Sequence, residues 1–297
     1  MDSLRAPLAF LRTLAVAGAM AAPALASPTA ETPKDSVTLQ QPTRTTVDAD
    51  GAVIHRYGNP DRLGRLADQA RLGTGPDDAR VINREHGYVV MAGKDHPTDH
   101  LTVPTAPISG VESPELTGPD AENYFADAWK DGRRQTAESL GTTVDQLPRE
   151  AIALAVNSQG GRSQDRLHIH ADRLDPELGA QLKEQLESGG VISDQWTLLK
   201  PIHGDHQYRA LWVEGSELSQ NPFQLVHDQL VAEHGEEYAR THMGQHSLAV
   251  VGQTDANGRP GFVILDGRYG SDPSLPNGPH DSASAEEWLL GHANTRR

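Results

Sequence analysis

The chain has 297 residues, 36% of them hydrophobic and 23% charged, which is the composition of a soluble globular protein with a core of its own. Its formal net charge is −15, and no basic stripe is present that would neutralise a nucleic-acid backbone, so nucleic acid is excluded as a partner. The chain has no cysteine, which excludes disulfides, thiolate metal ligands and a cysteine nucleophile.

The N-terminal residues predict an export signal. Arg5 and Arg12 precede a 14-residue apolar run that ends at the small-residue site Ala24-Leu25-Ala26. A membrane-spanning helix needs about 20 residues, so we expect a cleaved signal peptide over residues 1–26, with an uncleaved anchor as the alternative. The protein would then be exported to the periplasm, where it would lie peripherally at the inner membrane or anchored to it.

Residues 27–58 are rich in Pro, Thr, Asp and Ser, and we interpret them as a disordered linker. The remaining residues, 59–297, form the predicted domain. Its expected helices cover residues 59–73, 118–141, 175–190, 221–235 and 282–290. Its expected strands cover residues 87–93, 99–104 and 151–157, followed by a hairpin of 247–253 with 262–267. Strands in neighbouring pairs with helices between them indicate an α+β fold with a mostly antiparallel sheet and helices packed on it.

The stretch "AVNSQGGRSQDRLHIHADR", residues 155–173, places two histidines one residue apart after a polar loop. Side chains alternate faces along a strand, so His168 and His170 should share one face while Leu167, Ile169 and Ala171 cover the core. The sequence therefore predicts two imidazoles in register on one side of a strand.

The loop before the histidines is rich in groups that bind phosphate. Gly160 and Gly161 allow close approach of the backbone, and Arg162, Ser163 and Gln164 supply hydrogen-bond donors. A neutral imidazole beside a bound phosphoryl group can act as a nucleophile, because histidine titrates near pH 6.5. This combination favours chemistry at phosphorus.

Two other interpretations compete with phosphate chemistry. A His-x-His strand is often a zinc site, which His96, His100, His203, His206, His242 or His246 could complete. The spacing alone does not separate metal from phosphate chemistry, and the glycine-serine-glutamine loop favours phosphate. The third interpretation is a solvated strand edge with incidental histidines.

The stretch "NSQGGRSQDRLHIH" resembles the active-site motif of the histidine-triad superfamily. The blocks "GYVV", "PISGVESPEL", "FADAW", "SELSQNPFQLV" and "HMGQHSLAVVGQ" extend the resemblance, in the same order, to the bacterial CDP-diacylglycerol diphosphatases, which are also called pyrophosphatases. The resemblance covers roughly residues 81–288. It implies a HIT-like fold within the α+β class.

The resemblance also implies residue roles. The nucleophile of the superfamily corresponds to His168 and the last histidine of the triad to His170. Ser163 corresponds to the phosphate-binding serine and Asn157 to an asparagine that orients the site. Arg166 stands at the first triad position, where the pattern has histidine. It is either a clamp for a phosphate oxygen or a solvated charge at the start of the strand.

The expected activity is hydrolysis of the pyrophosphate bond of CDP-diacylglycerol to CMP and phosphatidate, through a nucleotidyl-histidine intermediate. The phosphoryl oxygens would be held by Asn157, Gly161, Arg162, Ser163, Gln164 and Arg166. The motif requires neither a metal nor another cofactor, and the partners would be the lipid nucleotide and the membrane surface. The alternatives are a periplasmic hydrolase of soluble CDP-alcohols or nucleotide sugars, and a non-enzymatic exported zinc-binding protein.

Overall fold

The computed structural model describes residues 41–74, 79–93, 96–187, 191–202, 207–269 and 290. The chain divides into two units, residues 1–39 and 40–297, and everything described here belongs to the second unit. The predicted signal peptide and, except for Leu290, the helix predicted over residues 282–290 lie outside the described residues.

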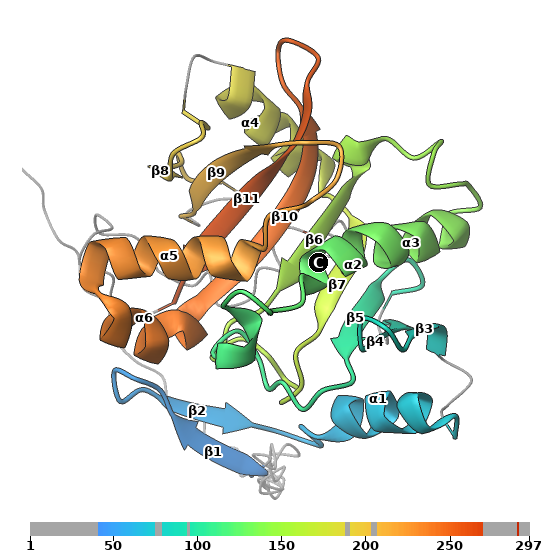
Figure 1. Cartoon of the computed structure of the whole chain (residues 1–297), viewed down its shortest axis with the longest axis vertical. Coiled ribbons are helices and arrows are strands. Elements are labelled where there is room, and N and C mark those ends of the chain that lie inside the picture. The colour runs from blue at the N-terminus through green and yellow to red at the C-terminus, as the bar shows by residue number, and fades with distance from the viewer. Residues whose placement is uncertain are drawn as a thin grey trace, which may run out of the picture. The chain divides into compact units, whose positions relative to one another are not determined.

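One large antiparallel sheet organises the described part of the chain (Figure 1). Its strand order is β3-β4-β5-β7-β6-β10-β11-β9-β8, and every pairing that the structure describes is antiparallel. The strands are β3 Ala79–Asn83, β4 Tyr88–Ala92, β5 His100–Pro104, β6 Ile152–Val156, β7 Ile169–Arg173, β8 Thr197–Leu198, β9 Arg209–Glu214, β10 His246–Thr254 and β11 Pro260–Arg268. The predicted α+β class with a mostly antiparallel sheet is therefore confirmed.

The helices follow the predicted ranges closely. They are α1 Arg62–Leu72, α2 Tyr124–Asp127, α3 Arg133–Ser139, α4 Pro176–Glu187, α5 Pro222–His234 and α6 Glu236–His242. A π-helical segment, Ala128–Gly132, joins α2 to α3, so the helix predicted from residue 118 begins only at Tyr124. Asn123 caps this start, since its side-chain oxygen accepts the amide of Ala126 at 3.2 Å. Within the described residues, every helix is too short or too polar to span a bilayer.

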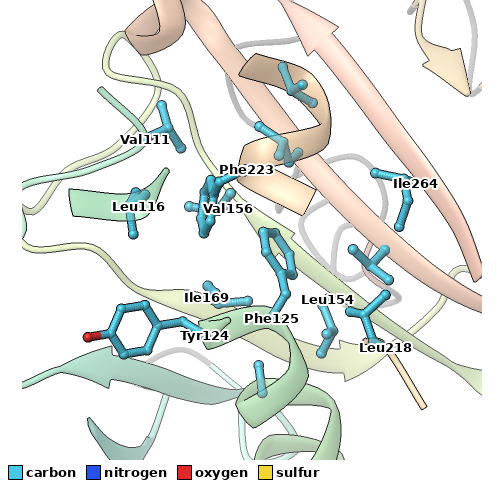
Figure 2. Close-up of a cluster of buried hydrophobic side chains, with 14 of the residues drawn as sticks. Val111, Leu116, Tyr124, Phe125, Leu154, Val156, Ile169, Leu218, Phe223 and Ile264 are labelled. Carbon is cyan, nitrogen blue, oxygen red and sulfur yellow. The ribbon is translucent and has the colours of Figure 1, made fainter. Parts of the chain in front are cut away.

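One face of the sheet is covered by α2, α3 and α5, which lie in front of the strands in Figure 1. The predicted apolar residues Leu167, Ile169 and Ala171 belong to the core on this face. Phe125 of α2 and Phe223 of α5 meet there with ring centroids 5.0 Å apart (Figure 2). This cluster fixes the position of β7, the strand that follows His168.

The opposite face carries the histidines. The strand pairing places Leu101, His170 and Ala155 in one row across β5, β7 and β6, and residues directly opposite each other share a face. Beyond Leu101 the face is apolar and α1 packs on it, and beyond Ala155 a second apolar cluster contains leucines of α4. His170 therefore lies between two apolar clusters on one side of the sheet.

The segment interpreted as a linker differs from its prediction where the structure describes it. Residues 44–56 form an antiparallel pair, β1 Arg44–Val47 and β2 Val53–Arg56, separate from the large sheet. The Pro- and Thr-rich composition gave no sign of this hairpin, because its stability comes from ion pairs with residues more than 100 positions away. The strands β3, β8 and β9 and the helix α6 were also missing from the sequence interpretation.

Candidate active site

The candidate site begins with His168, one residue before β7. The ring is buried, with 8% exposure, and its Nδ1 lies 2.7 Å from the backbone oxygen of Arg166. A carbonyl oxygen only accepts hydrogen bonds, so Nδ1 carries a proton and donates it to this oxygen. In the neutral ring the lone pair is then on Nε2, which is the atom that can act as nucleophile.

His170 lies beside His168, with the ring centroids 5.1 Å apart and the planes inclined by 60°. Its Nδ1 is 3.1 Å from Oδ2 and 3.2 Å from Oδ1 of Asp99, a buried residue just before β5. The carboxylate orients the ring and stabilises an imidazolium if one forms. The two histidines therefore have different electrostatic surroundings, as two groups with different chemical tasks require.

The loop that follows β6 forms a tight turn next to the histidines. Asn157 and Ser158 are both buried, and the amide of Gly161 donates to the hydroxyl oxygen of Ser158 at 3.1 Å. Ser163, by contrast, is exposed. The structure therefore places a second serine, Ser158, closer to the base of the turn than the serine that the motif singles out.

Arg162 was expected to hold phosphate, but in the structure its guanidinium contacts two carboxylates, those of Glu112 and Asp165. Its NH1 and NH2 donate to the two carboxylate oxygens of Glu112, the latter at 2.7 Å, and its Nε lies 3.3 Å from Asp165. The side chain is 6% exposed. A buried arginine with two carboxylate partners holds the loop in place.

Gln164 and Arg166 also contact protein groups. Gln164 accepts the amide of Leu63 at 2.9 Å and donates to the oxygen of Asn59, so it ties the loop to the start of α1. Arg166 is buried and donates to the backbone oxygens of residues 104, 105 and 106, the last at 2.6 Å. Of its two expected roles, a solvated charge at the strand start is therefore wrong.

The N-terminal hairpin reaches the same loop. Arg56 of β2 is 3% exposed, donates to the backbone oxygen of Gln159, and lies 3.2 Å from Asp165, which Arg44 also contacts. Burial raises the pKa of Asp165, but the hydrogen bond from Arg44 and the charges of Arg162 and Arg56 outweigh it, so the pKa lies below its usual value. The loop is thus held from both sides by ion pairs.

The histidines proposed as further zinc ligands fall into separate places. His242 stacks on Tyr238 with centroids 3.8 Å apart, and His246 contacts Asp266 at 2.6 Å. His96 lies 4.0 Å from Asp172 of β7, and His203 and His206 lie outside the described residues. In the part of the chain that the structure describes, neither His168 nor His170 belongs to a group of three candidate metal ligands.

Buried imidazoles with one nitrogen held by a carbonyl or a carboxylate are able to carry out nucleophilic and acid–base chemistry. The comparisons with known proteins identify which enzyme family this is. The family model of CDP-diacylglycerol pyrophosphatase matches residues 66–290. A CDP-diacylglycerol pyrophosphatase of Yersinia pestis is 35% identical over 241 residues, which cover 78% of this chain and 83% of that protein. The chain belongs to the CDP-diacylglycerol pyrophosphatase family and is a hydrolase.

Three residues of the site were not found from the sequence. Asp99, Glu112 and Asp165 are isolated acidic residues, and their partners lie up to 121 positions away. No local pattern marks such a pair. The signal that could have found Asp99 is the pairing of β5 with β7, which only the folded sheet reveals.

Proposed function

We propose that this chain hydrolyses the pyrophosphate bond of CDP-diacylglycerol to CMP and phosphatidate, with His168 as nucleophile, on a sheet of the HIT-like type. The observation that carries the proposal is the 2.7 Å contact between His168 Nδ1 and the Arg166 carbonyl. It assigns the Nδ1 proton and leaves the Nε2 lone pair for attack. The membership in the CDP-diacylglycerol pyrophosphatase family supports the substrate.

In the first step, Nε2 of His168 attacks the phosphorus on the nucleoside side. A bond from nitrogen to phosphorus forms, the bond from that phosphorus to the bridging oxygen breaks, and phosphatidate leaves with the electron pair. A cytidylyl-histidine remains. Splitting the hydrolysis into two displacements lowers the barrier of each.

In the second step, water attacks the same phosphorus and the bond to His168 breaks, which releases CMP. His170 accepts the proton of the water, and Asp99 stabilises the imidazolium that results, since their closest atoms are 3.1 Å apart. Asn157 and Ser163 contact the phosphoryl oxygens. Gly161, Arg162, Gln164 and Arg166 hold the loop rather than the phosphate, because their donors already have protein acceptors.

The test is release of CMP from CDP-diacylglycerol in the presence of EDTA. The wild-type chain should release CMP, and His168→Asn should be inactive with an unchanged melting temperature. His55→Asn is the matched control, since His55 is exposed on β2 and contacts Thr45. With substrate labelled on the nucleoside-side phosphate, His170→Gln should accumulate labelled protein.

Three results would contradict the proposal. Full turnover by His168→Asn would show that His168 is not the nucleophile. Loss of activity in EDTA would favour metal chemistry. Equal activity on CDP-choline would favour soluble CDP-alcohols as substrates.

We also propose that the protein is exported, with residues 1–26 removed, and acts at the membrane surface where its lipid substrate lies. The charged and apolar pattern before Ala26 supports this proposal. Mass spectrometry of the secreted chain should find Ser27 as the first residue. A chain that retains Met1 would contradict cleavage.

A further inference from the structure

A second group of titratable side chains lies on the opposite face from the histidine pair, where the turn between β3 and β4 meets the start of α2. His86 stands in this turn, and Glu122 and Asp127 flank the first residues of the helix. Side-chain hydrogen bonds hold the backbone of the turn and the backbone at the start of α2 in place. The side chain of Asn83 accepts the amides of Glu85 and His86 at 3.1 and 3.0 Å, and Asn123 caps the helix.

The three side chains converge. Nδ1 of His86 lies 2.9 Å from Oε1 of Glu122 and 4.0 Å from Oδ1 of Asp127. One ligand atom from each residue lies within 4.8 Å of the other two. In the described residues, this is the one group of three His, Asp or Glu side chains with such spacing.

Asp127 distinguishes this group from an ordinary surface ion pair. The residue is 7% exposed, and its Oδ2 has no hydrogen-bond partner. The only ion pair of Asp127 among the described residues is the 4.0 Å contact with His86, which already pairs at shorter distance with Glu122. Burial, and then the charge of Glu122, raise the pKa of Asp127 to about 7. A buried carboxylate oxygen without a donor is unfavourable, and a bound cation would satisfy it.

We propose that His86, Glu122 and Asp127 bind a divalent transition-metal ion, with Zn²⁺ as the best fit. One imidazole nitrogen and two carboxylate oxygens suit zinc, whereas Ca²⁺ and Mg²⁺ prefer ligand sets made of oxygen alone. Bond lengths near 2.1 Å place tetrahedral ligands about 3.4 Å apart. Nδ1 of His86 and Oε1 of Glu122, now 2.9 Å apart, would therefore separate slightly, and Oδ1 of Asp127 would come closer to Nδ1 than its present 4.0 Å. His86 and Glu122 are 43% and 35% exposed and have room to do so. Water supplies the fourth ligand at this open position.

The ion would join the β3–β4 turn to the helix that packs on the sheet. Tyr88 of β4 already donates to Asp131 of the same helical segment at 2.6 Å, so the ion would add a second link between the two elements. The site is structural and independent of the proposed hydrolysis, which uses His168 on the other face of the sheet.

The experiment is calorimetric titration of the EDTA-dialysed full chain with Zn²⁺, and separately with Ca²⁺. It is done in the His168→Asn background so that zinc held by the histidine pair does not contribute. We expect one zinc site, no calcium site, and a melting temperature that rises with zinc. Asp127→Asn and His86→Ala should each weaken zinc binding at least about tenfold.

Glu85→Gln is the matched control, because Glu85 is an exposed carboxylate in the same turn, and it should leave zinc binding unchanged. Asp127→Asn removes a buried charge without a donor, so it should fold, and its melting temperature without metal should equal or exceed that of the parent. Absence of saturable zinc binding would overturn the proposal. So would an affinity that is unchanged in Asp127→Asn, or binding found only when His168 is present.

Discussion

Single hydrogen bonds decide what each histidine of the site can do. A carbonyl oxygen holds Nδ1 of His168, and a carboxylate holds Nδ1 of His170. The carbonyl fixes the tautomer of the neutral ring with its lone pair on Nε2, and the carboxylate stabilises an imidazolium if His170 accepts a proton. The difference between the two residues is thus set by their partners and not by the His-x-His pattern.

The role of Asp99 gives the first prediction at this scale. Asp99→Asn should lower kcat for CDP-diacylglycerol about 10²-fold, because an amide stabilises the imidazolium of His170 less than a carboxylate does. The measurement is CMP release across pH, where the variant should also shift the acid limb of the profile. Asp228→Asn, an exposed change on α5, is the control. A profile identical to wild type would show that Asp99 only supports the fold.

Asp165 gives a second prediction, on stability. Its pKa is lower in the folded protein, so its stabilising contribution is fully present above its ordinary pKa of about 3.9 and is lost as pH falls through the lower folded value. Asp165→Asn leaves the buried Arg56 without its carboxylate and should cost about 3 kcal/mol at pH 7. Urea unfolding at pH 7 and below pH 4 checks this, since the difference from wild type should shrink in acid. Asp61→Asn, which removes only an exposed partner of Arg44, should change stability by less than about 1 kcal/mol. A difference that is constant with pH would refute the assignment.

Among the elements, the hairpin of β1 and β2 has the clearest link to function. Arg44 and Arg56 hold the loop that follows β6 through Asp165, and Asp48 accepts a hydrogen bond from Tyr269 at 2.7 Å. A Cβ placed on Gly160 of this loop would lie 3.0 Å from the Tyr269 ring, so the two segments are in close contact. The hairpin therefore supports the turn beside His168 and His170.

A truncation tests this support. A chain that begins at Asn59 should unfold at a lower temperature than one that begins at Ser27. Its kcat/KM should fall about 10²-fold, because in the proposed mechanism a displaced turn no longer positions the substrate. The measurements are thermal unfolding and CMP release. Val47→Ser, an exposed change on the same hairpin, is the control and should resemble the full-length chain. Equal activity of both chains would mean that residues 27–58 are the dispensable linker that their composition suggested.

Several elements were predictable because their signals are local. The helix at Asn221-Pro222 begins where the Asn-Pro pair predicts, and the helix at Asn59-Pro60 begins two residues later, at Arg62. The strand β6 is a continuous apolar run, and β10 contains one. The short strands β3 and β8 and the hairpin of β1 and β2 were not predictable, because they are only two to five residues long and many of their residues are polar or half exposed. The π-helical segment Ala128–Gly132 likewise has no signature in its sequence.

At the scale of the whole molecule, the net negative charge of the protein disfavours binding of an anionic substrate. The net charge of −15 repels an anionic lipid nucleotide and any anionic membrane around it. Ionic strength of 0.15 M reduces this repulsion, since the screening length falls to about 8 Å. The apparent KM for CDP-diacylglycerol in anionic vesicles should therefore fall roughly two- to threefold between 10 mM and 150 mM NaCl. Vesicles of a neutral lipid with the same fraction of substrate should show a smaller change. A KM that rises with salt would mean that a local basic surface attracts the lipid.

By itself, the sequence determined the α+β class, the main helices and strands, the pairing of His168 with His170 on one face, and the resemblance to the CDP-diacylglycerol pyrophosphatase family. These features depend on residues that are close together in the sequence. The regular geometry of helices and strands determines which of those residues share a face. The tertiary structure decided which side chains contact the residues of the two sites. It directed Arg162 to Glu112, placed Asp99 on His170, packed the hairpin against the loop, and brought His86 to Asp127. Such contacts join residues that are distant in the chain, and their charges acquire a definite effect only when the fold removes them from water together.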